Sequence, residues 1–287
     1  EIVYHNGKSA RAAAEVAGGC DAVVIVAGYD YRDEGEKVET GGDRKRLALR
    51  PEDESLILAV AAANPNTLVV LESGSAVLCE AWREKVAAIV AAWYPGMEGG
   101  RALADLLLGR ANFSGKLPCT FPASEHHLPF FDSAAQEIEY GYFHGYRLLD
   151  HIGQPAAFAF GFGLSYTTFR ASDLRVEQAR LGGADTLRAQ LQVTNTGAVA
   201  GEEVVQLYVG APGAAVERAV KELKAFKRVA LQPGETQNVT FELPVQTLAC
   251  YDEETAGWKL EAGSYRLYAG SSSRQQDLQR VDFEIGE

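Results

Sequence analysis

The sequence predicts an α/β domain with a mostly parallel sheet over residues 1–165, followed by an all-β domain, an antiparallel sandwich, over residues 166–287. Three observations support this fold class. A length of 287 residues suits two domains. Up to about residue 165, apolar runs of strand length alternate with helical patterns. After Thr167 apolar and polar residues alternate, which is typical of half-buried strands.

The expected helices of the first domain are Ala-rich, or begin with Pro and acidic residues that suit a helix N-terminus. They are Ser9–Ala17, Pro51–Ala63 and Glu98–Leu108. The apolar runs between them are Asp21–Gly28, Thr67–Leu71, Ala76–Trp82 and Val86–Tyr94. Continuous apolar strands separated by helices indicate a parallel sheet covered on both faces. Only a short lead-in, residues 1–7, precedes the first helix, so we expect the front of this sheet to be missing or supplied by another chain.

The second domain contains about seven short runs with period-two alternation in about 120 residues. The clearest are Leu187–Val193, Val204–Val209, Ala225–Leu231, Asn238–Leu243 and Tyr265–Ala269. Turn sequences separate them, among them Asn195-Thr196-Gly197 and Pro233-Gly234. This number and spacing of strands indicates an antiparallel sandwich of the immunoglobulin or fibronectin type.

The charge balance argues against nucleic acid as the main partner. The chain has 27 basic and 39 acidic residues, a net charge of −12, whereas a nucleic-acid binder usually carries a basic patch. The basic clusters are Arg44–Arg46 and Lys221–Arg228, and we interpret the second as the solvent-facing side of a strand. No apolar run approaches the roughly 20 residues that span a bilayer, so we expect no membrane segment.

The cysteines and the N-terminus give little evidence of cofactor or compartment. Cys20, Cys79, Cys119 and Cys250 are scattered without metal-ligand spacing. Cys20 and Cys119 border apolar runs, so we favour buried free thiols there over disulfides. We predict no cofactor and no metal site. No signal peptide is evident at the start, so the compartment stays open with a slight preference for the cytoplasm.

The long polar stretch after the first expected strand, residues 29–50, is predicted to be a loop. In parallel sheets, sites form beyond the carboxyl ends of strands, which is where this loop begins. Its carboxylates up to residue 39 are Asp30, Asp33, Glu34, Glu36 and Glu39, and Tyr29 and Tyr31 add aromatic rings. Such a loop could deliver a general acid to a sugar, although a solvated acidic loop is the commoner outcome for an acidic run. Composition does not select one carboxylate.

Other classes of site find weaker support. Gly96–Gly100 opens a helix but lacks the spacing of a nucleotide phosphate loop, which disfavours a nucleotide-dependent enzyme. Ser73-Gly74-Ser75 is not the strained Gly-x-Ser-x-Gly turn of a serine hydrolase. His126 and His127 are adjacent on a loop, where neighbouring side chains diverge, so surface contact is expected rather than a shared metal.

Several segments, taken together and in order, resemble the C-terminal portion of glycoside hydrolase family 3, the β-glucosidase and β-xylosidase family. They are Glu39–Arg44, Asn64–Leu71 with Ser73-Gly74, Ala92–Gly100 with Ala104-Asp105, Asn112–Pro118, Gly145–Arg147, Phe160–Thr167 and Gly201–Val209. The similarity covers almost the whole chain. It implies that residues 1–165 are the family's α/β sandwich domain and residues 166–287 its fibronectin type III-like domain.

The resemblance also implies a reaction, the retaining hydrolysis of terminal β-glycosides, most simply release of non-reducing β-D-glucose. That reaction uses two carboxyl groups about 5–5.5 Å apart. In this family the nucleophile is an Asp on an N-terminal barrel, and the acid/base lies on the loop matched by residues 29–44. Glu39 is the best match to the acid/base, Glu36 is the runner-up and Glu34 comes third. Asp43 and Arg44 resemble loop supports.

No barrel is present in this sequence, so the resemblance implies a partner chain or fragment that carries the nucleophile. We prefer a nicked enzyme whose parts remain together. The alternatives are a non-catalytic carbohydrate- or protein-binding module and, with less support, a nucleotide-dependent α/β enzyme. The sugar, the linkage and the oligomeric state are left open.

Overall fold

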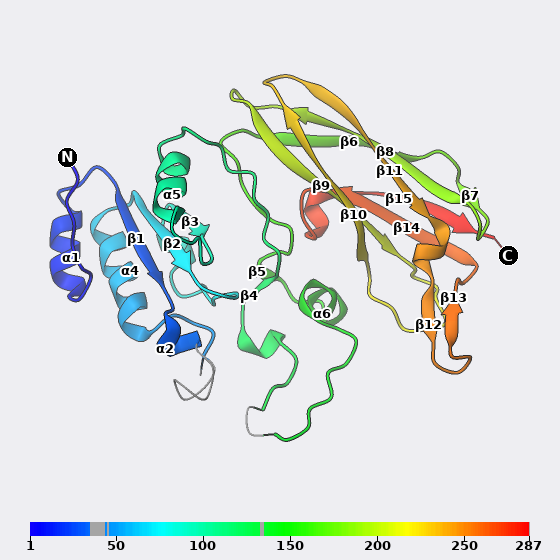
Figure 1. The fold of residues 1–287 in the computed structure, drawn as a ribbon, viewed down its shortest axis with the longest axis horizontal. Helices are drawn as coiled ribbons and strands as arrows, with labels where there is room; N and C mark the ends of the chain where they lie inside the picture. The colour runs from blue at the N-terminus through cyan, green and yellow to red at the C-terminus, as the bar shows by residue number, and fades with distance from the viewer. Residues whose placement is uncertain (35–43, 45, 133–134, 287) are drawn as a thin grey trace. The chain divides into compact units, whose positions relative to one another are not determined.

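The computed structural model describes residues 1–34, 44, 46–132 and 135–286. They form two compact units, which are described separately (Figure 1). The first unit contains residues 1–108 and 121–127. The second contains residues 109–120 and those from 128 onward.

The first unit is built on a three-stranded parallel sheet with the order β1-β2-β3. The strands are β1 (Val23–Gly28), β2 (Thr67–Glu72) and β3 (Ala88–Ala91). Val23 is paired with Thr67, and Leu68 with Ala88. The parallel sheet inferred from apolar runs is thus confirmed, and its three strands end at the same edge.

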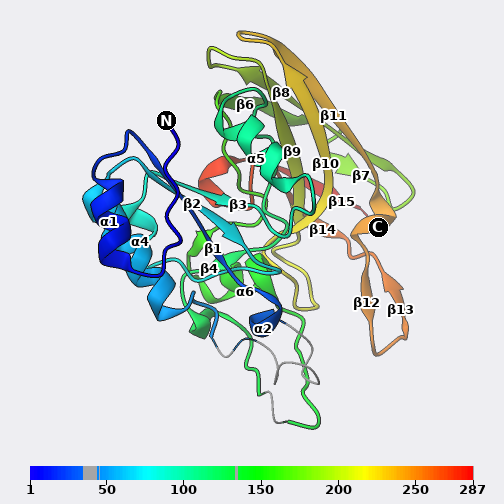
Figure 2. The ribbon, with the colours of Figure 1, turned by 60° about the vertical axis from the view of Figure 1, so that its left-hand side comes forward.

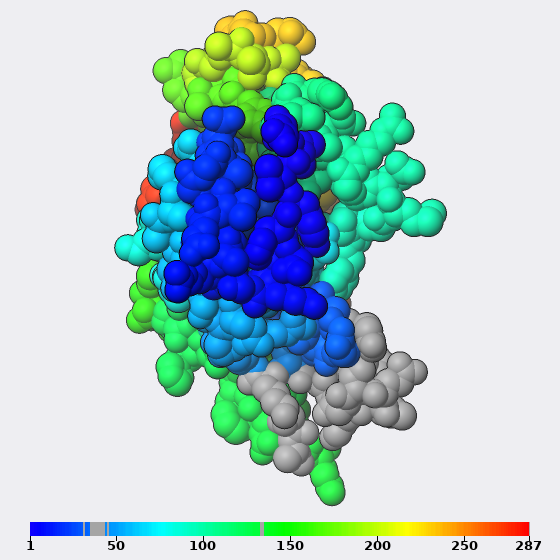
Figure 3. Space-filling model, turned by 90° about the vertical axis from the view of Figure 1, so that its left-hand side faces the viewer, coloured from blue at the N-terminus to red at the C-terminus, as the bar shows by residue number. Residues whose placement is uncertain are grey.

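Two helices lie on one face of this sheet, α1 (Ala10–Ala17) and α4 (Pro51–Ala63) (Figures 1 and 2). Ser9 caps α1 by accepting from the Ala12 N–H, and α4 begins at Pro51 with three acidic residues in its first turn. The Asn64 amide donates to the carbonyls of Ala17 at 2.9 Å and Cys20 at 2.7 Å, which ties the end of α4 to the end of α1. Figure 3 shows α1 and the N-terminal segment, in dark blue, at the surface of this unit.

The opposite face of β1 is open to solvent, so the expectation of a sheet covered on both faces is wrong there. Ile25 is buried toward the helices, whereas Val24 and Val26 are 50% and 58% exposed. Among the strands that the structure describes, β1 pairs with β2 alone and is an edge strand. Parallel sheets normally have both faces and both edges protected.

The expected strand at Ala76–Trp82 is the other difference in this unit. The segment turns instead, with one parallel bridge from Leu78 to Ala48, and ends in the short 3-10 helix η1 (Arg83–Lys85). Val77, Cys79 and Trp82 are fully buried, so the apolar character of the segment reflects core packing and not sheet pairing. The remaining short elements are α2 (Tyr31–Glu34) inside the predicted loop, α5 (Gly99–Leu107), β4 (Phe121–Pro122) and η2 (Glu125–His127).

The second unit begins its regular structure with α6 (Gly145–Ile152) and β5 (Ala156–Phe158) and continues into a sandwich of two sheets (Figure 1). One sheet has the order β10-β9-β14-β15-β7 and the other β11-β8-β6. The strands are β6 (Phe169–Val176), β7 (Arg180–Leu181), β8 (Thr186–Asn195), β9 (Gly201–Gly210), β10 (Glu222–Leu231), β11 (Thr236–Pro244), β14 (Gly263–Gly270) and β15 (Leu278–Ile285). All pairs are antiparallel except β15 with β7.

The antiparallel sandwich is therefore confirmed, with more strands than the seven expected. Alternate residues of β8, Leu187, Ala189, Leu191 and Val193, point into one core, as the period-two pattern predicted. A separate hairpin, β12 (Cys250–Asp252) and β13 (Gly257–Lys259), follows the 3-10 turn η3 (Val245–Leu248). A last 3-10 turn, η4 (Gln275–Asp277), precedes β15.

Two side-chain expectations are corrected. Lys221 is 1% exposed and its ammonium lies 2.5 Å from Asp150, so it is not part of a solvent-facing strand surface. All four cysteines are free thiols, but only Cys79 is buried; Cys20 and Cys119 are half-buried because they lie just outside strands and not inside them.

Candidate functional site

The candidate site lies at the carboxyl edge of the parallel sheet, where three loops leave three neighbouring strands. Tyr29 and Asp30 follow β1 and lead into α2, residues 73–75 follow β2, and residues 92–94 follow β3. Because parallel strands end at the same edge, side chains from all three loops can meet there. This is the edge at which the sequence placed the acidic loop.

Glu34 joins these three strand ends. Its Oε2 accepts a hydrogen bond from the Gly74 backbone N–H at 2.8 Å and another from the Tyr94 hydroxyl. Its Oε1 lies 3.3 Å from Nε of Arg44. The side chains of Arg44 and Glu34 are only 9% and 16% exposed. Such charge-assisted contacts, largely shielded from water, are stronger than exposed ones.

Arg44 extends the network to the loop after β2 and back to the end of β1. Its guanidinium donates to the Ala76 carbonyl at 3.2 Å and to the Ser75 hydroxyl. It also lies over the Tyr29 ring, 4.5 Å from the centroid. The Tyr29 hydroxyl in turn donates to the Ala48 carbonyl at 2.8 Å. These contacts suit the supporting role expected of Arg44.

A second group of charges holds α2 against the start of α4. The Arg50 guanidinium binds the Asp33 carboxylate through Nε at 3.1 Å and through a second, short contact. The same guanidinium lies 3.8 Å from Asp30 and 3.7 Å from Asp53. The Asp30 backbone N–H donates to Asp33 at 2.9 Å, so Asp33 and Asp30 act in local structure.

The electrostatics of the site keep Tyr94 protonated. Tyr94 is 55% exposed, but partial desolvation, its hydrogen bond to the Glu34 carboxylate and the charge of that carboxylate together raise the pKa of Tyr94 to about 12. Near neutral pH the phenol is therefore a permanent donor to Glu34. Burial likewise raises the pKa of Tyr29, despite the nearby Arg44 cation.

Trp93 lies at the end of β3 next to Tyr94. It is half-buried, has a φ of 55°, and meets the Phe121 ring edge-on at 6.2 Å between centroids. The left-handed backbone conformation at a bulky residue is uncommon and turns the chain sharply after β3. This turn places Tyr94 beside Glu34.

Of the three acid/base candidates from the sequence, the structure describes Glu34. Glu34 lies within the network, whereas Glu36, Glu39 and Asp43 lie outside the described residues. Sequence reasoning did not identify Tyr94 and the Gly74 N–H as partners of Glu34, or Ser75 as a partner of Arg44. The signal that could have found them is their position, because each follows the last residues of a parallel strand.

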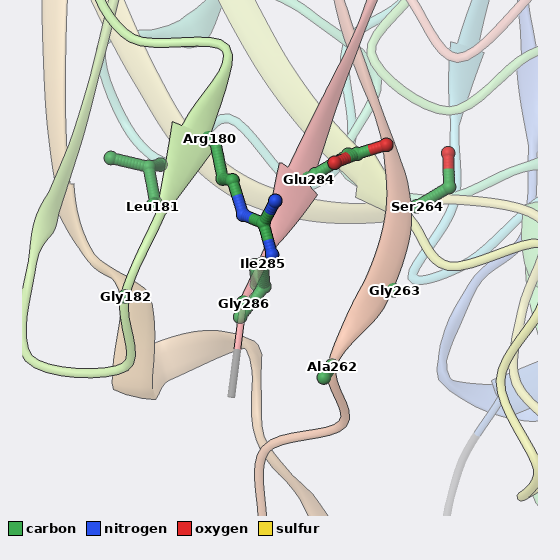
Figure 4. A pocket seen from close by; sticks show the side chains of 9 residues that line it. All are labelled: Arg180, Leu181, Gly182, Ala262, Gly263, Ser264, Glu284, Ile285 and Gly286. Carbon is green, nitrogen blue, oxygen red and sulfur yellow. The ribbon is translucent and has the colours of Figure 1, made fainter.

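The described residues hold no group of three or more His, Cys, Asp and Glu side chains that could bind a metal ion. Within the same residues, no helix combines the length and apolar character required to cross a membrane. A separate hollow lies in the second unit, where β7 and β15 end and β14 begins (Figure 4). Of the described residues that line it, Glu284 alone is a carboxylate, and Arg180 is the cation beside it, so it offers no carboxylate pair.

Comparison with known families matches both parts of the chain. Residues 5–166 match the Glycosyl hydrolase family 3 C-terminal domain, and residues 203–273 match the Fibronectin type III-like domain. The chain is 38% identical over 284 residues to "Probable beta-glucosidase I" of Neosartorya fischeri, covering 96% of this chain and 33% of that protein. It is 39% identical over 267 residues to "Thermostable beta-glucosidase B" of Acetivibrio thermocellus, covering 91% and 35%.

Solved structures of β-glucosidases also align with almost the whole of this chain. Beta-glucosidase 3B from Thermotoga neapolitana, in complex with glucose, aligns with a TM-score of 0.85 at 35% identity, over 100% of this chain and 40% of that one. Beta-D-glucoside glucohydrolase from Trichoderma reesei aligns with a TM-score of 0.87 at 29% identity, over 97% and 42%. The chain thus spans about a third of the length of the curated relatives it matches.

Proposed function

This chain belongs to glycosyl hydrolase family 3, and on that basis we propose that it carries the acid/base part of a retaining β-glucosidase. The substrates would be β-glucosides and oligosaccharides with a terminal, non-reducing β-D-glucose. The nucleophile, an Asp, would come from a barrel domain that this sequence does not contain.

The observation that supports this proposal is the position of the two described residues that flank the acidic segment, Glu34 and Arg44. Residues 35–43 are bounded by Glu34 and Arg44, and both of these bind the carboxyl edge of the sheet. The segment contains Glu36 and Glu39, the two leading candidates for the acid/base. Substrates of open α/β sheets bind beyond this edge, which supports a catalytic carboxylate there.

Glu34 is a poor choice for the acid/base. Both of its oxygens are engaged, Oε2 by Gly74 and Tyr94 and Oε1 by Arg44. A general acid needs an oxygen free to reach the glycosidic oxygen of the substrate. The choice therefore narrows to Glu39, with Glu36 as runner-up.

In the proposed reaction, the barrel Asp attacks the anomeric carbon while Glu39 protonates the leaving oxygen. A covalent glycosyl-enzyme forms and the aglycone departs. Glu39, now ionised, then removes a proton from a water molecule, which attacks the anomeric carbon and releases glucose and the Asp carboxylate. A negative nucleophile close by would help Glu39 to keep its proton before the first step.

A partner that carries the barrel is supported by the surface of the first unit. Val24 and Val26 are exposed on one face of β1, and the hydrogen-bonding groups along the outer edge of β1 face no strand among the described residues. An apolar edge strand of this kind is usually covered in a native assembly.

The experiment compares hydrolysis of an aryl β-glucoside by the chain alone and by the chain together with a barrel-bearing polypeptide. We expect activity only in the second case, and Glu39→Gln should abolish hydrolysis of cellobiose while leaving part of the activity on dinitrophenyl glucoside. The reason is that a dinitrophenolate departs without protonation. Full activity of the chain alone, or wild-type cellobiose hydrolysis by both Glu39→Gln and Glu36→Gln, would refute the proposal.

A second candidate function, a non-catalytic carbohydrate- or protein-binding module, is favoured by one surface feature. Tyr251 and Trp258 are directly paired across the hairpin β12–β13, with ring centroids 5.8 Å apart, and are 49% and 76% exposed. Exposed aromatic rings offer apolar faces to a sugar or a protein. Retention of the chain on a soluble β-glucan in native gels, lost in Trp258→Ala, would favour the carbohydrate module.

A further inference from the structure

Two aromatic side chains share one face of the hairpin β12–β13, which pairs with no other strand among those that the structure describes (Figure 1). Tyr251 and Trp258 are directly opposite in the register, and their rings meet edge-on, with an interplanar angle of 77° and centroids 5.8 Å apart. Tyr251 is 49% exposed and Trp258 is 76% exposed. Because so much of both side chains faces solvent, the pair does not serve the core of the sandwich.

The base of the hairpin is fixed to the sandwich on both sides. Before the hairpin, η3 contributes Val245 and Leu248 to the buried core, and the Arg218 guanidinium donates to the Leu248 carbonyl at 3.0 Å. After it, the Glu261 carbonyl accepts from the Tyr265 hydroxyl at 2.8 Å. A two-stranded hairpin is only marginally stable by itself. These attachments therefore hold the ring pair in place before a ligand binds, which lowers the entropy cost of binding.

The turn that closes the hairpin is acidic. Residues 252–254 are Asp, Glu and Glu, and Lys259 is the single cation of residues 250–259. The Asp252 carboxylate accepts from the Glu254 backbone N–H at 3.0 Å, whereas Glu253 and Glu254 are exposed. Carboxylates accept hydrogen bonds from hydroxyl groups. They also repel the phosphates of a nucleic acid, whose bases would otherwise stack on the rings. The charge thus favours an uncharged ligand that is rich in hydroxyl donors.

The size of the ring pair distinguishes a sugar from a protein partner. Tyr and Trp side chains bury about 150–250 Å² each when they are fully covered. Two rings that are already partly covered therefore offer well under the roughly 800 Å² per partner of a stable protein–protein interface. This area suits one or two sugar rings, whose C–H faces pack on aromatic rings while their hydroxyls reach polar groups at the edge.

We propose that the hairpin β12–β13 is a binding site for a neutral β-glucan chain. Trp258 packs against a sugar ring, Tyr251 holds the indole in position through its edge-on contact, and the acidic turn accepts hydrogen bonds from sugar hydroxyls. The chemistry of the hairpin selects a neutral sugar chain, and the choice of a β-glucan rests on the proposed function. Unlike a non-catalytic module, the chain combines this binding with its catalytic part. A glucan held at the hairpin meets the rest of the enzyme at a raised effective concentration.

The first test measures acrylamide quenching of tryptophan fluorescence in the chain alone, with and without soluble mixed-linkage β-glucan. Quenching reports mainly on Trp258, since Trp82 is fully buried and Trp93 is half-buried. We expect the glucan to protect Trp258 from the quencher in a saturable manner. Carboxymethyl cellulose has the same backbone but carries negative charge, so it should bind at least about tenfold more weakly.

Variants of the chain then separate the ring pair from general effects. Tyr251→Ala keeps the Trp258 reporter and should weaken glucan binding at least about threefold, which is within the range that an aromatic pair contributes. Trp258→Ala should abolish retardation by the glucan in affinity electrophoresis, and Trp258→Phe should restore part of it. Phe226→Ala is the matched control, because Phe226 is also exposed, at 66%, but lies on β10. The urea unfolding midpoints of these variants should stay unchanged, since the rings lie outside the buried core.

Three results of these experiments would overturn the proposal. They are equal binding of the anionic polymer, unchanged glucan binding in Tyr251→Ala and Trp258→Ala, and an equal loss of binding in Phe226→Ala. A fourth is dimerisation of the wild type that Trp258→Ala abolishes, without any binding of glucan, because the rings would then form a protein contact.

The second test uses the chain together with the barrel-bearing polypeptide and compares mixed-linkage β-glucan with cellobiose. Trp258→Ala should raise KM for the polymer at least about tenfold and leave kcat and KM for cellobiose unchanged, because only a long chain can be held at the hairpin while its end reacts. An equal rise in KM for both substrates would overturn the recruiting role. Absence of β-glucosidase activity in the wild type would instead refute the proposed function, while the quenching test still decides whether the hairpin binds a glucan.

Discussion

The backbone N–H of Gly74 donates to Oε2 of Glu34 over 2.8 Å, so the loop after β2 holds the carboxylate that ends the helix after β1. A methyl group added at Gly74 would lie 2.9 Å from this same oxygen and 3.3 Å from the Tyr94 ring. The close approach therefore depends on the absence of a side chain at Gly74. Glycine is the residue that allows backbone to approach another group this closely.

Gly74→Ala should displace Glu34 and weaken its bond to Tyr94, at little cost to folding. The clashing atom is the end of a flexible side chain, so it can rotate away. We expect faster hydrogen exchange of the backbone amide at position 74, which loses its carboxylate acceptor, with a change of less than about 1 kcal/mol in unfolding free energy. Gly100→Ala is the control, because a methyl there meets nothing within 4 Å and lies in α5. Equal exchange in the two variants would contradict the expected role of Gly74.

Tyr94 should titrate abnormally, and its pKa should respond to Glu34. The pKa of Tyr94 is raised to about 12 by partial desolvation and by the adjacent carboxylate. Removing the negative charge in Glu34→Gln should lower this pKa toward the ordinary value near 10. The measurement is the ultraviolet difference titration of wild type against Tyr94→Phe, repeated in the Glu34→Gln background.

The raised pKa of Tyr94 also predicts how the unfolding free energy changes with pH. The folded-state pKa of Tyr94 lies above the unfolded value, so the folded protein binds the proton more tightly. Stability attributable to Tyr94 is present below about pH 10 and is lost as the pH rises toward 12. Tyr94→Phe should therefore show a flatter decline of unfolding free energy over this interval. An unchanged decline would contradict the assignment of the shift to Tyr94.

Much of the fold could be predicted because local signals and packing agree. The helix over Pro51–Ala63 matches its predicted limits, since Pro, the acidic first turn and the Asn64 break all act locally. Ala76–Trp82 was predicted wrongly because an apolar run shows that residues are buried, but not whether they pair in a sheet.

The candidate site was predictable in place but not in its contacts. The rule for parallel sheets located the edge after β1, yet Glu34, Gly74 and Tyr94 are far apart in sequence and their contacts depend on the register of three strands. Lys221 was misjudged for a related reason. Its partner Asp150 belongs to a distant helix, and periodicity along one segment carries no information about it.

The exposed face of β1 should tolerate polar residues in the chain alone. Val24 is 50% exposed, whereas its neighbour Ile25 points into the core and is 7% exposed. Val24→Lys should change the unfolding free energy by about 0.5 kcal/mol or less, and Ile25→Lys should prevent folding. Val24→Lys should also weaken association with a barrel-bearing partner, as measured by gel filtration. Severe destabilisation by Val24→Lys in the chain alone would contradict the exposure of this face.

The Lys221–Asp150 pair gives the sharpest stability prediction for the second unit. The ammonium is 2.5 Å from the carboxylate, Lys221 is 1% exposed, and burial raises the pKa of Asp150 despite the adjacent cation. Removing one partner leaves a buried charge without compensation, so Asp150→Asn and Lys221→Met should each cost about 3–5 kcal/mol in unfolding free energy. The double variant removes both charges and should be less destabilised than the sum of the two single variants, by at least about 2 kcal/mol. The measurement is urea unfolding of the wild type, the two single variants and the double variant, which together form a double-mutant cycle. Arg280→Met is the control, because Arg280 pairs with Asp282 at the exposed surface. Additive single effects would mean that the two charges do not compensate each other in the fold.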